Sequence, residues 1–203
     1  MTHAQRINDA LRRLPAWPVY ALAAGWAAWL FWLGLTGGLG PEPINALERA
    51  YGEVALQLLI AGLVVTPLRR WTGVSLLKYR RALGLSAFFF VVAHVAVWAV
   101  LDLQSLSRVG AELAKRPHIT IGFAAFLLLV PLAVTSNNAS LRRLGAAAWR
   151  RLHRLTYPAV LLGGLHYVWL VKGFPLEPFL YLAAIIALLG VRIGWPRLRA
   201  ALA

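Results

Sequence analysis

Long apolar runs alternate with short polar segments along the whole chain. A helix needs about 17 to 25 apolar residues to cross the hydrocarbon core of a bilayer, which is roughly 30 Å thick. Six runs come near this length, although Gln57 interrupts the second and only a short turn separates the last two. The pattern predicts an all-α integral membrane protein with six spans, at residues 17–35, 53–68, 82–101, 119–135, 155–171 and 178–195.

The segments between these runs are short and carry no recognisable second domain. All are far shorter than the roughly 40 residues below which a chain seldom folds without other help. Neither a G-x-G-x-x-G nor a Walker-type phosphate-binding loop occurs in the sequence. We therefore expect one transmembrane domain over residues 1–203, folded as a six-helix bundle.

The distribution of positive charge predicts the orientation of the bundle. Successive polar segments carry three, one, five, three, five, one and three of the 21 Lys and Arg residues. Because segments rich in Lys and Arg stay in the cytoplasm, both termini are expected there, which requires an even number of spans. The net charge of +14 therefore indicates membrane topology in contact with lipid, and no nucleic-acid partner is expected.

The available side chains limit the kinds of metal site. The chain has no Cys, and its single Met is the first residue, so thiolate and thioether ligation are excluded. A metal would have to be held by histidine or by oxygen ligands. Five histidines are present: His3, His94, His118, His153 and His166.

Two of these histidines, His94 and His166, lie in the middle of predicted spans. Each is roughly 18 to 20 Å of helix beyond the last basic residue on the cytoplasmic side, so both are expected at one depth in the outer half of the membrane. Two imidazoles at matched depth on different helices suit the axial positions of a haem standing between the helices. We expect a b-type haem there, with Gly163 and Gly164 leaving room for the ring.

Two other interpretations of this pair remain open. Each histidine could simply hydrogen-bond a neighbouring helix, an interaction worth about 1 kcal/mol in membranes. The pair could also relay protons, but no Asp or Glu lies in the middle of a predicted span to pass a proton onward.

His153 lies at the cytoplasmic start of the fifth span, 13 residues before His166. A second haem would need a partner for it on the third span, where Arg81 occupies the corresponding position. One haem is therefore expected, with His153 either a third metal ligand or an interfacial histidine. Arg80, Arg81 and Arg154 are candidate cofactor-binding residues, because guanidinium groups bind propionates, phosphates and quinone head groups through charge-assisted hydrogen bonds.

Several stretches also resemble a known family. In chain order they are GLGPEPIN, VVTPLRR, RRALGLSAFFFVVAHV, ELAKRPHITIG, LAVTSNN and RRLGAAAWRRLHRLTYPAVLLGGLHYVWLVK. The chain resembles MsrQ (YedZ-like), the haem-binding membrane subunit of the periplasmic protein-methionine-sulfoxide reductase system, within the ferric-reductase-like transmembrane group.

This resemblance implies an electron-transfer subunit of an oxidoreductase complex and not its catalytic subunit. Such a subunit lies in the bacterial inner membrane and carries electrons from the quinone pool, through haem b and FMN, to a periplasmic molybdopterin-containing methionine-sulfoxide reductase that repairs oxidised envelope proteins. The implied haem residues are His94 and His166, with His153 as a third functional histidine. A self-sufficient transmembrane metal or quinone reductase and a non-redox membrane anchor are the alternatives.

Overall fold

A computed structural model describes residues 2–171 and 173–201, with side chains up to residue 192 in the last helix. Within this part the chain is helical and contains no strand. Short 3-10 turns at Leu77–Tyr79 and His153–Leu155 precede two of the helices. The helices are α1 (His3–Arg13), α2 (Trp17–Leu35), α3 (Pro43–Thr72), α4 (Arg80–Ala96), α5 (Leu106–Lys115), α6 (Pro117–Val134), α7 (Asn138–Leu152), α8 (Thr156–Leu170) and α9 (Leu176–Ala201).

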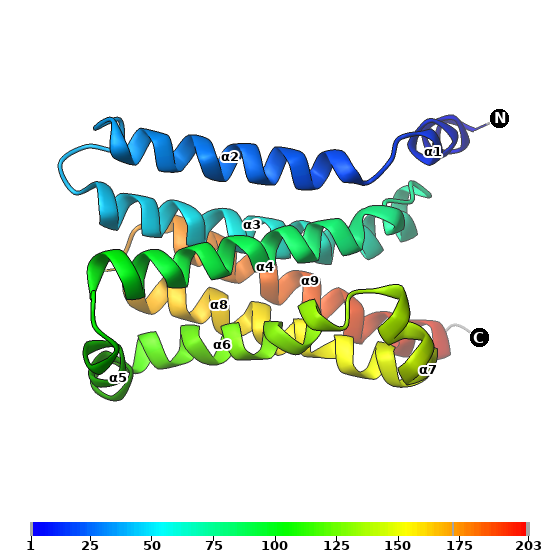
Figure 1. Ribbon diagram of the computed structural model, residues 1–203. Coiled ribbons are helices and arrows are strands. Elements are labelled where there is room, and N and C mark those ends of the chain that lie inside the picture. Colours follow the sequence, from blue (N-terminus) through cyan, green and yellow to red (C-terminus); the bar gives the residue numbers. More distant parts are fainter. Residues whose placement is uncertain (1, 172, 202–203) are drawn as a thin grey trace.

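Long helices lie over all six predicted apolar runs and pack lengthwise as a bundle (Figure 1). A proline in the first turn starts α2, α3 and α6, where the missing N–H has no helical partner to lose. Helix α3 ends at Gly73, whose φ of 74° is the left-handed conformation that glycine adopts readily. Helix α4 continues as a π-helical segment, Val97–Asp102, where a regular α-helix was expected. The all-helical fold class is confirmed.

The number of membrane spans is only partly settled by these helices. Within the described residues, four helical stretches are long and apolar enough to cross a membrane: α2, α3, Leu77–Asp102 and α6. Helix α8 has 15 residues, slightly fewer than the roughly 17 that a span needs. The six-span count and the orientation stay predictions, but α1 and the end of α9 do lie at the same end of the bundle (Figure 1).

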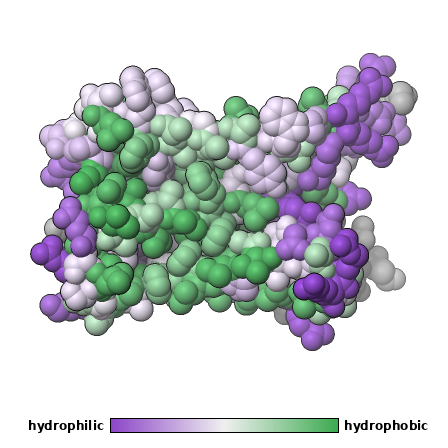
Figure 2. Space-filling model, in the orientation of Figure 1, coloured by the Kyte–Doolittle hydropathy of each residue, from purple (hydrophilic) through white to green (hydrophobic). Residues whose placement is uncertain are grey.

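Three shorter helices lie at the two ends of the bundle, where only connecting segments were expected. Helices α1 and α7 lie at the end that holds both termini, and α5 lies at the other (Figure 1); we call these the α7 end and the α5 end. Helices α1 and α5 are amphipathic. They contain no long apolar run, so the pattern of apolar runs does not predict them. Polar surface gathers at the ends and an apolar band lies between them (Figure 2).

Helix α3 contributes to both parts of the core. Near its middle, buried Leu56, Leu59 and Leu63 pack with Val160 of α8 and Ile185 of α9. Nearer the α5 end, a second group of buried side chains joins α3 to α2 and α4; its members are Ala27, Leu30, Leu47, Tyr51, Ala55, Phe90 and Val97. The first turns of α3 therefore have close neighbours on α4, where one of the two candidate ligands lies.

A proline inside α3 leaves one backbone carbonyl without its helical donor. Pro67 has no N–H to offer the carbonyl of Leu63, four residues earlier. The guanidinium group of Arg192 in α9 donates to this carbonyl at 2.8 Å and to the Tyr157 hydroxyl of α8 at 3.0 Å. Arg192 thus joins three helices through the position that the proline opens.

We expect Arg192→Met to lower the free energy of unfolding by about 1 to 3 kcal/mol, because the Leu63 carbonyl loses its donor in an apolar interior. Adding Pro67→Ala should recover part of the loss, because that substitution restores a backbone N–H four residues after Leu63. Chemical unfolding in detergent micelles, followed by circular dichroism, measures both effects. An equal loss with and without Pro67→Ala would show that the carbonyl is not what Arg192 stabilises.

Candidate functional site

His94 of α4 and His166 of α8 face each other inside the bundle. Their ring centroids are 6.3 Å apart and the ring planes make an angle of 75°. Both side chains are partly buried. The structure therefore brings together the two histidines that the sequence analysis singled out, although they are 72 positions apart in the chain.

Each ring is anchored by a hydrogen bond from its Nδ1 to the backbone of a neighbouring helix. Nδ1 of His94 donates to the Glu48 carbonyl of α3 at 2.9 Å, and Nδ1 of His166 donates to the His118 carbonyl of α6 at 2.7 Å. A carbonyl oxygen only accepts, so Nδ1 carries the proton in both rings and Nε2 keeps its lone pair for a metal. The same tautomer is thus imposed on both histidines from opposite sides of the site.

A glycine next to each accepting carbonyl makes room for the ring. Gly52 follows Glu48 by four residues, and Gly122 follows His118 by four, so each glycine lies one turn beyond the carbonyl on the same helix face. A methyl group at Gly52 would lie 3.1 Å from Nδ1 of His94, and one at Gly122 would lie 2.7 Å from Nδ1 of His166. Neither position tolerates a side chain without moving the ring.

The spacing of the rings suits two axial ligands on one metal ion. Two imidazoles that each directed Nε2 at one metal ion, with metal–nitrogen bonds of about 2 Å, would have ring centroids about 6 Å apart. The centroids of His94 and His166 are 6.3 Å apart. Among the described residues, no group of three or more His, Cys, Asp or Glu could hold a metal ion by itself. The pair therefore fits a metal whose other ligands come from a prosthetic group, as they do in haem.

His118 contributes to the site through its backbone. Its carbonyl anchors His166, and its ring lies 6.4 Å from the His166 ring with the planes inclined by 27°. An anchoring role for His118 was not expected from the sequence. The sequence signal for it is a glycine four residues after a polar residue near the start of a helix, which occurs as ERAYG in α3 and as HITIG in α6.

His153 lies apart from the pair, in the 3-10 turn before α8. Its Nε2 is 3.1 Å from the Thr135 hydroxyl, and its ring stacks on Trp149 with centroids 3.7 Å apart. Burial lowers the pKa of His153, and the positive charges of Arg80 and Arg81 lower it further. Both effects favour the neutral form of the His153 ring.

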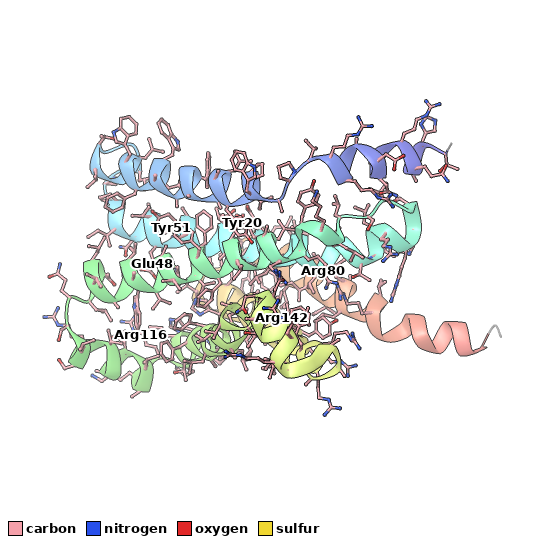
Figure 3. The ribbon with its side chains drawn as sticks, turned by 45° about the vertical axis from the view of Figure 1, so that its right-hand side comes forward. Tyr20, Glu48, Tyr51, Arg80, Arg116 and Arg142 are labelled. Carbon is pink, nitrogen blue, oxygen red and sulfur yellow. The ribbon has the colours of Figure 1, made fainter. Side chains whose placement is uncertain are left out.

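The candidate arginines lie on the His153 side of the bundle. Arg80 begins α4 and lies toward the end opposite Glu48, as Figure 3 shows. Arg81 donates to the Asn138 side chain of α7 at 2.9 Å, and Arg154 is exposed. Since Arg81 is 13 residues, or about 20 Å of helix, from His94, these arginines form a second group distinct from the histidine pair.

Gly163 and Gly164 do not make room for a cofactor ring, so that expectation was wrong. A methyl group at Gly163 would meet Leu56 of α3, and one at Gly164 would come within 2.8 Å of Ile185 of α9. Both glycines face neighbouring helices because of the way α8 is rotated. They allow close helix packing, and the room beside the rings comes from the glycines of α3 and α6.

Comparison with known proteins gives the family of the chain. The ferric reductase like transmembrane component family matches residues 50–164, a range that includes Gly52, His94 and Gly122 and ends just before His166. The protein-methionine-sulfoxide reductase heme-binding subunit MsrQ of Brucella anthropi is 44% identical over 184 residues, which are 90% of this chain and 83% of the relative. The chain belongs to the MsrQ family. The MsrQ proteins of Brucella ovis and Brucella canis are each 45% identical over the same shares.

Membership of the MsrQ family confirms the resemblance drawn from the sequence stretches, and with it a multi-pass membrane protein of the ferric-reductase-like group. No solved structure gives a significant match to the chain.

Proposed function

We propose that the chain is the membrane electron-transfer subunit of a methionine-sulfoxide reductase complex and holds one b-type haem between His94 and His166. The observation that carries the proposal is the pair of facing imidazoles, each fixed in one tautomer by a carbonyl on another helix. A bound haem would supply one-electron transfer through its iron. The chain sets the tautomer, the separation and the burial of the two ligands.

The path of the electrons is proposed from the family and from the charge pattern. The relatives are named heme-binding subunits of a protein-methionine-sulfoxide reductase. We infer that electrons enter from the quinone pool of the bacterial inner membrane, and that they leave to a periplasmic, molybdopterin-containing catalytic partner. The positive-inside rule supports this direction, because it puts the basic α7 end in the cytoplasm and the histidine pair in the outer half.

The group of arginines near His153 is proposed as the FMN site. His153, Arg80, Arg81 and Arg154 lie on one side of the bundle, where guanidinium groups would bind a flavin phosphate. Ligation of a second haem by His153 would require it to leave the Thr135 hydroxyl, and Arg81 offers no matching imidazole. We therefore propose a single haem, with the subunit acting as a conduit and its partner as the catalyst.

The ligand assignment is tested by the optical spectrum of the purified chain. We expect the low-spin spectrum of a b-type haem with two histidine ligands, and its loss in both His94→Ala and His166→Ala. His118→Ala is the matched control, because its contribution to the site is a backbone carbonyl that the substitution leaves in place. Retention of the spectrum in both ligand variants would reject the assignment, whatever the behaviour of the partner protein.

The role of the two glycines is tested by the amount of haem bound per chain. Gly122→Ala should remove most of the haem and Gly52→Ala a smaller part, because the added methyl group would approach the ring to 2.7 Å in the first case and 3.1 Å in the second. Gly62→Ala in α3 is the control, since a methyl group there meets nothing within 4 Å.

Thermal unfolding separates this effect from misfolding. Replacing glycine by alanine inside a helix favours the helix by about 1 kcal/mol, so the two variants should lose haem without a matching loss of helical stability in the haem-free chain. Full haem content in Gly122→Ala would contradict the close packing of the His166 ring against Gly122.

A further inference from the structure

A groove between α3 and α9 combines a polar end with an apolar floor. It has a volume of about 530 Å³, and Gln57 of α3 with Glu177 and Tyr181 of α9 lines its polar end. Ile60, Val64 and Leu180 line the rest, and the groove is open to the surroundings. Gln57 is exposed on this flank of a membrane-spanning helix, where a polar side chain is costly unless it has partners or a function.

Hydrogen bonds hold the polar end in a fixed arrangement. The Gln57 amide nitrogen donates to the Tyr181 hydroxyl at 2.8 Å and to the Glu53 carboxylate at 2.9 Å. The Tyr181 hydroxyl donates to the same Glu53 oxygen at 3.3 Å. Among the described residues, no hydrogen bond reaches the side-chain oxygen of Gln57, so this acceptor is available to a ligand that carries a hydroxyl group.

Residues next to the histidine site in the sequence link it to the polar end of the groove. Glu53 directly follows Gly52, which packs under His94. Tyr167 directly follows His166, and its ring centroid lies 5.9 Å from that of Tyr181. Gln57 is five residues, or about 7.5 Å along the helix axis, from Gly52, on a different face of α3. The groove is thus linked to the site through α3, whose Gly52 packs against His94, and through α8, which carries His166.

We propose that this groove binds the reduced form of an isoprenoid quinone, with its head group at Gln57, Tyr181 and Glu177 and its tail along the apolar floor. The inference deepens the proposed function and rests on it for the identity of the quinone as electron donor. The hydroxyls of the reduced ring would donate to the side-chain oxygen of Gln57 and to the carboxyl group of Glu177. Glu53 accepts hydrogen bonds from Gln57 and Tyr181 and so fixes the polar end. The two carboxyl groups disfavour the phosphate of an ordinary anionic lipid.

Adjacent alanines of α9 provide a matched pair of variants for the test. Ala184 lines the groove, whereas Ala183 is exposed and does not line it. Ala184→Phe should fill the groove, and Ala183→Phe adds the same side chain one position away. Gln57→Leu removes the hydrogen-bonding head-group contact at similar size and leaves the floor unchanged.

The experiment titrates the full-length chain, in nanodiscs of phosphatidylcholine and without oxygen, with decylubiquinol and measures the Kd by calorimetry. We expect Ala184→Phe and Gln57→Leu each to raise the Kd at least tenfold, and Ala183→Phe to change it less than twofold. The optical spectrum of each preparation should stay that of the unaltered chain, because none of these residues touches either histidine.

The outcomes separate the groove from the proposed function. No binding by the unaltered chain, or the same Kd in all four proteins, overturns the groove assignment even when the haem spectrum is present. Displacement of bound phospholipid by Ala184→Phe, with the Kd for decylubiquinol unchanged, makes the groove a lipid site and also overturns it. The expected Kd pattern in a chain that binds no haem supports the groove and rejects the proposed function.

Discussion

The hydrogen bond from each Nδ1 to a backbone carbonyl of a neighbouring helix sets the geometry of the whole site. A carbonyl oxygen has two lone pairs, so it can accept from a ring and still serve its own helix. Because the acceptor belongs to the backbone, its position is as fixed as the helix itself. The ring reaches it only where the helix surface is bare, and this is why a glycine lies one turn beyond each acceptor, at Gly52 and Gly122. Helices α3 and α4, and likewise α6 and α8, must therefore pack closely.

Much of this architecture follows from local features of the sequence. Apolar runs and their lengths predict where long helices lie, and the rise per residue puts His94 and His166 at one level before any contact is known. Their anchors are harder to predict, because any residue type supplies a carbonyl and the signal lies in the glycine four residues later, at Gly52 and Gly122. Gly163 and Gly164 were misread because the rotation of a helix about its axis, set by tertiary packing, decides what its glycines face.

Polar side chains also decide which helices become neighbours. In lipid, apolar surfaces gain little from choosing one helix over another, so packing of small residues and hydrogen bonds between helices carry the specificity. Helix α3 shows this clearly. It meets α4 through the Glu48 carbonyl and His94, α9 through Gln57 and Tyr181, and α9 again through the Leu63 carbonyl and Arg192. Each contact uses a polar group that the bilayer could not satisfy.

The separation of the two rings depends on packing that touches neither of them. His94 is hydrogen-bonded to α3 and His166 to α6. The distance between the rings therefore depends on the distance between the α3–α4 pair and the α6–α8 pair. Helices α3 and α8 meet where Leu56 lies against Gly163, and α8 is held to α9 where Ile185 lies over Gly164. A side chain larger than methyl at Gly163 would move α8 away from α3 and carry His166 with it, and the hydrogen bond to the His118 carbonyl would survive only if α6 moved with α8. The glycines of α8 thus act on the site by setting the spacing of its ligands, and those of α3 and α6 by setting their orientation.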